Sequence, residues 1–233
     1  MLTVTTIGLT CKAVFKLGLC SITVNGLPNL VSVVEDDARR KRRIGLITVS
    51  NHISTYTSPV LSYFFRNGQV LETFRGNGVY QRSIDTAIEK LNDGAWVHLF
   101  GEGKVNQPDK YPQKDGLGHL PRFKWGAGRI LSEVGNLPTI IPMWLTGFDR
   151  LMPEGRKFPF NFMPRFGQHL SVTFGEPISG GELQKIVNYR HASRSQPSAA
   201  DLKAFRSALV TVLHESVESL GRSVSGDSLT GEK

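Results

Sequence analysis

The stretch Ile44-Gly45-Leu46-Ile47-Thr48-Val49, followed at once by Ser50-Asn51-His52, decides the fold of this chain. Its apolar and β-branched residues form a short run that ends in polar residues, which is typical of a strand buried in a sheet. Two runs of similar character, Trp96–Phe100 and Thr139–Leu145, follow later in the chain. We interpret the first two runs as buried strands and Thr139–Leu145 as a strand interrupted by Pro142.

The segments between these strands have the pattern of helices. Ser83–Leu91 carries four apolar residues at the spacing of one helix face, namely Ile84, Ala87, Ile88 and Leu91. We also predict helices over Pro59–Arg66 (after an N-cap at Ser58), Arg122–Val134 and Asp201–Leu220, and strands over Gln69–Phe74 and Leu170–Phe174. Strands that alternate with helices indicate an α/β fold with a mostly parallel central sheet flanked by helices.

The length of 233 residues fits one domain with a core of its own. We divide the chain into an apolar, membrane-associating segment over residues 1–34, a domain over residues 35–222, and a polar, disordered tail over residues 223–233. The first segment carries only Lys12 and Lys16 as charges before Glu35, but it is too interrupted for a spanning helix. A helix that dips into one leaflet is the favoured interpretation, and a helix and strand packed on the core are the alternative.

The charge balance restricts the class of partner. Lys and Arg number 28 against 20 Asp and Glu, a net charge of +8, which favours an anionic membrane surface, phosphate-bearing substrates or nucleic acid. The basic run over residues 39–43 fits a membrane anchor, a nucleic-acid patch or an exposed loop. No aromatic platform or basic helix accompanies it, so nucleic acid is the least favoured partner. The two cysteines, Cys11 and Cys20, indicate neither a disulfide framework nor a metal site.

Polar residues and glycines follow the predicted strands where each one ends. They are Asn51 and His52 after the first strand, Arg75 and Gly76 after Gln69–Phe74, and Phe100, Glu102 and Gly103 at the end of the next. Ligands of parallel sheets bind beyond these carboxyl ends. A histidine there can act as a general base, an arginine can hold a phosphate, and glycines let backbone N–H groups approach an anion. Each residue alone has an ordinary structural explanation, so the prediction depends on their joint placement.

These residues lie within longer strings that resemble the tafazzins, which belong to the glycerolipid acyltransferase superfamily. The matching strings are Val49–His52, Phe74–Gln81, Trp96–Asn106, Arg122–Gly126 and Ile140–Trp144. The resemblance covers roughly residues 30–180, which is most of a domain. The strings Gly101–Asn106 and Arg122–Gly126 are typical of the tafazzin branch in particular.

The resemblance implies an acyltransferase-like fold and a function. The implied activity is the transfer of a fatty acyl chain between phospholipids and lysophospholipids without coenzyme A or any other cofactor or metal. Its implied substrates are cardiolipin and monolysocardiolipin in a mitochondrial membrane, at a surface that faces the intermembrane space. His52 would be the catalytic base. The implied substrate-binding residues are Asn51, Arg75, Gly76, Phe100, Glu102, Gly103 and Pro142, with Arg75 and Gly76 on the phosphate and Pro142 in the pocket wall.

The chain departs from the family pattern directly after His52. The family has an Asp five positions later, and Thr57 stands there, which cannot carry the charge that stabilises an imidazolium. In a serine-protease triad the loss of the orienting carboxylate costs about 10⁴ in rate, so a comparable loss is expected. Only residues 53–58 separate His52 from Pro59. The helix and strand that the family has there would take roughly 20–35 residues, so the gap is consistent with the loss of one strand–helix unit.

Two other functions stay open beside the transacylase. One is an acyltransferase of the same superfamily that takes its acyl chain from acyl-CoA. The other is a peripheral membrane-binding protein that keeps the apolar segment and the basic run while its chemistry is impaired.

Overall fold

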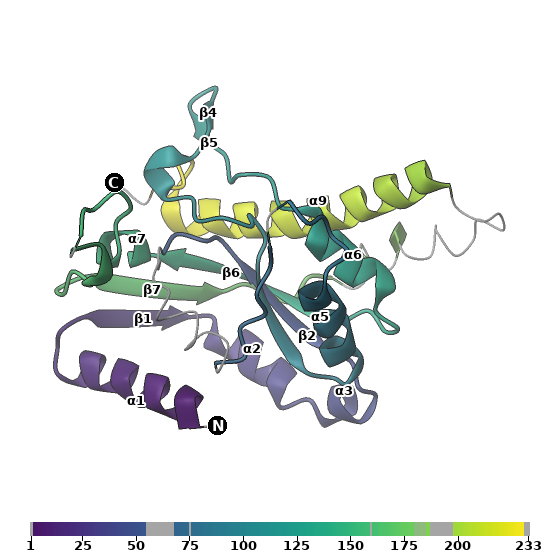
Figure 1. The fold of residues 1–233 in the computed structure, drawn as a ribbon, viewed down its shortest axis with the longest axis horizontal. Helices are drawn as coiled ribbons and strands as arrows, with labels where there is room; N and C mark the ends of the chain where they lie inside the picture. Colours follow the sequence, from purple (N-terminus) through teal and green to yellow (C-terminus); the bar gives the residue numbers. More distant parts are fainter. Residues whose placement is uncertain are drawn as a thin grey trace.

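The computed structural model describes residues 2–54, 68–74, 76–158, 160–179, 181, 183, 185–186 and 198–230. The predicted helix over Pro59–Arg66 lies outside the described residues, as do Thr57 and Arg75. A central five-stranded sheet has helices on both faces (Figure 1). Its strands are β1 (Ser21–Asn25), β2 (Leu46–Ser50), β3 (Trp96–Phe100), β6 (Thr139–Thr146) and β7 (His169–Phe174). The α/β fold with a mostly parallel sheet is confirmed.

Strand order in the sheet is β1-β7-β6-β2-β3. Strand β2 lies between β6 and β3 and runs parallel to both, with Val49 opposite Pro142 on one side and Leu99 on the other. Strand β7 is antiparallel to β6 and parallel to β1. The carboxyl ends of β2, β3 and β6 therefore meet at one end of the sheet, and β1 and β7 begin at that same end.

Helices bury both faces of β2, which explains why its apolar run is uninterrupted. On one face Ile47 and Val49 pack with α5 (Arg82–Asn92), α6 (Trp125–Glu133) and α9 (Ala199–Ser225). On the other face Leu46 packs with Leu30 of α2 (Leu27–Val34). The chain begins with helix α1 (Leu2–Lys16). The remaining elements are short, namely α3 (Asp37–Lys41), η1 (Pro108–Lys110), β4 (Gln113–Lys114), β5 (Leu117–Gly118), α7 (Phe148–Leu151) and η2 (Phe160–Phe162).

Pro142 is buried in the middle of β6, where a missing N–H would normally break a ladder. Its carbonyl accepts the N–H of Gly175 at 2.8 Å, and Gly175 lies just past the end of β7. Because the N–H and C=O of one strand residue point to the same side, the absent donor of Pro142 faces the end of β7. The pairing of β6 with β2 is therefore unaffected.

The predicted strand over Gln69–Phe74 is wrong, because these residues form turns and irregular backbone. Gln69 has a left-handed conformation with φ 64°, which does not fit an extended strand. The side-chain amide of Gln81 takes up the backbone of Phe74 instead, accepting its N–H at 2.8 Å and donating to its carbonyl at 3.4 Å. A side chain thus supplies the hydrogen bonds that a neighbouring strand would have made.

Strand β3 is the edge of the sheet, so the prediction that Trp96–Phe100 is buried is wrong for part of it. Trp96 is 52% exposed and Phe100 is 42% exposed. Both side chains lie on the same face of β3, because residues two apart on a strand share a face.

Parts of both chain ends belong to the folded structure, although the division drawn from the sequence sets residues 1–34 and 223–233 apart from the domain. Strand β1 pairs with β7 along its whole length, so residues 21–25 belong to the central sheet and the boundary after residue 34 does not separate a structural unit. The strand of the alternative interpretation is therefore present in the sheet, whereas most described side chains of α1 are exposed. At the other end α9 extends to Ser225, and Leu229 is 1% exposed. Ser225 and Leu229 are therefore packed, which differs from the expected disordered tail, and the carbonyl of Asp227 holds this part of the chain by accepting the N–H of Gly118.

Candidate active site

The predicted site residues gather where β2 and β3 end side by side. Asn51 and His52 follow β2, and Gly101 and Glu102 follow β3, whose last residue Phe100 pairs in register with Ser50. The structure therefore brings together the residues of two strand ends that lie 50 positions apart in the chain.

Asn51 is fully buried and bonds to the neighbouring strand β6. Its side-chain oxygen accepts the N–H of Leu145 at 2.8 Å, and its side-chain nitrogen donates to the Leu145 carbonyl at 3.0 Å. The amide group acts as a substitute peptide and continues the pairing of β2 with β6 by one step. Asn51 thus fixes the direction in which the chain leaves the sheet towards His52, and its side chain faces protein.

The backbone of His52 is held on both sides by the loop after β3. Its N–H donates to Oε1 of Glu102 at 2.8 Å, and its carbonyl accepts the N–H of Asn106 at 2.8 Å. The side chain of Asn106 in turn donates to Oε2 of Glu102. Glu102 is 1% exposed, so this carboxyl group lies beneath His52 and supports it from inside the protein.

The environment of Glu102 favours its protonated form. Burial raises the pKa of the Glu102 carboxyl from 4.5 to about 7, and the hydrogen bonds from His52 and Asn106 and the charge of Lys104 oppose that rise. Removing a carboxylate from water costs free energy, and the two hydrogen bonds from His52 and Asn106 offset that cost only in part. Glu102 therefore titrates near neutral pH.

The ring of His52 stacks on Phe100. The two ring centroids are 4.2 Å apart and the planes are inclined by 20°. Phe100 also contacts His98 edge-on, at 4.6 Å between centroids. Sequence reasoning missed His98. The two-residue period of a strand, which places His98 and Phe100 on one face of Trp96–Phe100, could have indicated it.

His98 closes a hydrogen-bonded chain on this face of the sheet. Thr48 Oγ1 accepts the indole N–H of Trp96 at 2.9 Å, which leaves its own proton for Nδ1 of His98 at 2.8 Å. Nε2 of His98 then donates to Ser50 Oγ at 3.3 Å, and that hydroxyl donates to the Asn51 carbonyl at 3.0 Å. Every link is satisfied with a neutral imidazole. Burial, and to a smaller extent the nearby His52, lower the pKa of His98 to about 4, in agreement with this arrangement.

Two glycines shape the loop after β3 for different reasons. A Cβ at Gly101 would lie 2.4 Å from the ring of Phe123, so the close packing of that ring requires glycine there. Gly103 has φ +67°, a conformation that other residues rarely adopt. The Gly101 carbonyl also accepts the N–H of Lys124 at 2.7 Å, which joins this loop to the start of α6.

Gly76 and Pro142 lie apart from the group around His52. Gly76 has φ 90° in an exposed turn, and a Cβ there would meet nothing within 4 Å. Pro142 lies within the sheet and pairs with Val49. Val49 precedes Asn51 by two residues in the chain. Of the predicted set, the structure brings together His52, Phe100 and Glu102, with Gly103 beside them, and it places Asn51 under the loop.

Gln107 is a second residue that sequence reasoning missed. It is 7% exposed, and its side-chain nitrogen donates to the carbonyls of Ile53 at 3.2 Å and Met152 at 2.9 Å. Its side-chain oxygen accepts the N–H of Glu154 at 3.0 Å. One amide group therefore ties the chain after His52 to the segment after β6. No local pattern marks such a role, because all its partners are backbone groups distant in sequence.

Among the residues that the structure describes, no group of three or more His, Cys, Asp or Glu is placed to hold a metal ion. The chemistry on offer is that of an imidazole at the end of a central parallel strand, supported by a buried carboxyl group. Such a histidine can take a proton from a hydroxyl group and return it to a leaving group.

Comparison with known proteins agrees with this arrangement. The family model described as "Acyltransferase" matches residues 38–146, which include β2, β3 and most of the site. The chain is 31% identical to "Tafazzin" of Drosophila melanogaster over 195 residues, covering 70% of this chain and 48% of that protein. It is 28% identical to "Taffazin" of Dictyostelium discoideum over 209 residues, covering 75% of this chain and 67% of that protein.

A third relative carries a different name. The chain is 30% identical to "N-acylphosphatidylethanolamine synthase" of Arabidopsis thaliana over 191 residues, covering 67% of this chain and 62% of that protein. The chain thus spans roughly half to two thirds of the length of these relatives. Fold, site and matches together place the chain in the acyltransferase superfamily. Within that superfamily it is similar to tafazzins, at 27–31% identity.

Proposed function

We propose that the protein is a phospholipid–lysophospholipid transacylase that works without coenzyme A, with His52 as its base. The observation that carries the proposal is the fixation of the His52 backbone between Glu102 and Asn106 at the end of β2. A general base must be held within hydrogen-bond reach of the proton that it removes. Two backbone hydrogen bonds and a stacked Phe100 provide that constraint.

The proposed reaction is an exchange of ester bonds. His52 takes the proton of a lysophospholipid hydroxyl while that oxygen attacks the ester carbonyl carbon of a donor phospholipid. The ester C–O bond of the donor then breaks, and the imidazolium returns the proton to the departing oxygen. Nδ1 of His52 is buried, so the proton is exchanged at Nε2. The number of ester bonds is unchanged, and no cofactor is consumed.

The substrates that we propose are membrane phospholipids with cardiolipin and monolysocardiolipin among them, in a mitochondrial membrane facing the intermembrane space. The resemblance to the tafazzins and the net charge of +8 support anionic lipid substrates. Arg75 and the backbone of Gly76 would hold a phosphate, while Gly103 and Pro142 would border the lipid. The N-terminal 34 residues would associate with the membrane, since α1 is apolar and Leu9 is 62% exposed. No described helix has the length and apolar character needed to span a bilayer.

We further propose that the activity of this chain is weakened by a missing segment after His52. The match to the Arabidopsis protein spans 191 aligned positions, but 67% of 233 residues is about 156 residues, so about 35 positions have no residue here. The open edge at β3, with Trp96 and Phe100 exposed, is where an additional strand would pair. Thr57 stands at the position of the family Asp, and its neutral hydroxyl cannot supply the negative charge that the Asp carries.

Purified protein with a diacyl donor phospholipid and an isotopically labelled lysophospholipid tests the proposal by mass spectrometry of the products. We expect slow transfer of the acyl chain, and we expect His52→Gln to abolish it. His119→Gln is the matched control, because the His119 ring pairs with Glu218 of α9 and not with a residue of the candidate site. Transfer that survives His52→Gln would contradict the assignment of the base.

The same assay separates the alternatives. Release of a thiol from acyl-CoA, without transfer from the diacyl donor, would indicate the acyl-CoA-dependent enzyme. Transfer to the amine of phosphatidylethanolamine would indicate the reaction for which the Arabidopsis relative is named. No transfer to any acceptor, combined with vesicle binding that His52→Ala leaves unchanged, would indicate a peripheral membrane-binding protein.

A further inference from the structure

The segment between β6 and β7, residues 147–168, exposes an unusual concentration of large apolar side chains. Phe158 is 79% exposed, Phe160 62%, Met163 56% and Phe166 51%. Large apolar residues are common on surfaces singly, but a group of them in a short segment marks an interaction site. The core of the protein does not account for these side chains.

The charges exposed on the same segment are all basic. Arg150, Lys157 and Arg165 are exposed, whereas Asp149 and Glu154 are partly buried. Glu154 also forms an ion pair with Lys110, which neutralises it. A surface of exposed aromatic rings flanked by arginine and lysine complements the interface of an anionic bilayer. There the rings enter the headgroup layer and the cations meet the lipid phosphates.

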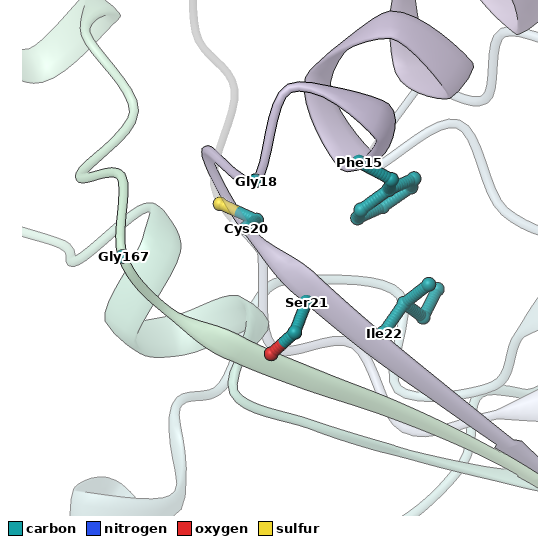
Figure 2. A pocket seen from close by; sticks show the side chains of 6 residues that line it. All are labelled: Phe15, Gly18, Cys20, Ser21, Ile22 and Gly167. Atoms are coloured by element: carbon teal, nitrogen blue, oxygen red, sulfur yellow. The ribbon is translucent and has the colours of Figure 1, made fainter.

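The segment continues into the surface formed by α1. The N–H of Gly167 donates to the carbonyl of Leu19 at 2.6 Å, and Leu17 beside it is 73% exposed. Figure 2 shows a pocket of about 400 Å³ at this junction, with Phe15 of α1 and Ile22 of β1 facing each other across it. The end of α1 and this pocket thus extend the surface of residues 147–168 at Gly167.

This surface lies at the end of the sheet that carries His52. The segment starts at the carboxyl end of β6 and returns to the start of β7, and both are at that end (Figure 1). The buried Gln107 connects the two directly, because its side chain bonds to Ile53 next to His52 and to Met152 and Glu154 of the segment. A bilayer bound here would lie next to the loop of the base.

We propose that residues 147–168 dock the protein onto an anionic bilayer and thereby present the His52 end of the sheet to membrane lipids. The proposal rests on the proposed function only in taking the substrate to be a bilayer lipid. It adds a second contact that begins 113 residues after the end of the N-terminal segment in the sequence and meets that segment in the fold, at Leu19 and Gly167.

Flotation of the full chain with phosphatidylcholine vesicles, with and without anionic lipid, tests this. Phe158→Ser with Phe160→Ser should lower the partition onto anionic vesicles about tenfold. The matched control is Val70→Ser with Leu117→Ser, which removes two exposed apolar side chains outside residues 147–168 and should change little. Replacing Arg150, Lys157 and Arg165 by Gln should remove most of the preference for anionic over neutral vesicles.

Equal partition of the phenylalanine variant and the control would overturn the proposal, as would a basic-residue variant that keeps its preference for anionic lipid. Self-association that the phenylalanine substitutions abolish, with vesicle binding unchanged, would show that a second copy of the chain covers the surface instead. Vesicle binding does not require turnover. A protein that floats as expected but transfers no acyl chain would therefore refute only the proposed function.

Discussion

At the scale of single residues, the site depends on a carboxyl group that is costly to bury. Glu102 supports the His52 backbone, and burial raises the pKa of its carboxyl to about 7. In the unfolded chain this carboxyl ionises near pH 4.5, whereas in the folded protein it stays protonated up to about pH 7. Between these two values folding takes up a proton, so the contribution of Glu102 to stability falls as the pH rises.

We therefore expect Glu102→Gln to remove a pH-dependent loss of stability. The free energy of unfolding of the natural protein, relative to that of the variant, should fall by about 3 kcal/mol between pH 4.5 and pH 7. Urea unfolding of both proteins across this range measures the difference, with the exposed Glu89→Gln as a control for loss of a carboxylate. A difference that does not change with pH would show that Glu102 is ionised throughout.

At the scale of elements, the helices α6 and α9 approach each other closely. A Cβ at Gly128 of α6 would lie 2.6 Å from the carbonyl oxygen of Arg206 in α9, and backbone cannot move aside as a flexible side chain can. The same two helices are joined by an ion pair between Arg206 and Glu133 at 2.6 Å. The small size of Gly128 thus sets how near the long helix α9 lies to α6.

We expect Gly128→Ala to destabilise the protein by about 2 kcal/mol, because the helices must separate and the buried contacts between them loosen. Gly126→Ala in the same helix is the matched control, since its Cβ would meet only the end of the Ile84 side chain, at 3.2 Å. It should be neutral or stabilising, because alanine favours the helix by up to about 1 kcal/mol over glycine. Thermal unfolding of the two variants gives the comparison, and equal midpoints would contradict the close crossing.

At the scale of the whole molecule, the open edge of the sheet at β3 is the feature to test. We expect that insertion of the corresponding segment of the Drosophila relative between His52 and Pro59 raises acyl transfer by orders of magnitude, up to about 10⁴-fold if it restores the charged partner of His52. It should also protect the backbone amides of β3 from hydrogen exchange, because an edge strand gains a neighbour. An insertion that folds and protects β3 without any gain in transfer would show that the gap does not limit the chemistry.

The sequence alone determined the alternation of strands and helices, the positions of β2, β6 and α5, and the placement of His52 and Glu102 at neighbouring strand ends. These follow from local signals, namely apolar runs, helical spacing and the rule that parallel strands end together. Only the tertiary structure decided which strand is the edge, that β1 joins the sheet beside β7, and that Gln69–Phe74 is bound by Gln81 and forms no strand. It also decided that Glu102 supports His52 from inside, and that His98 and Gln107 belong to the site. Each of these depends on pairing between residues distant in the chain, and the burial that results is a property of the packed molecule that no local window of sequence contains.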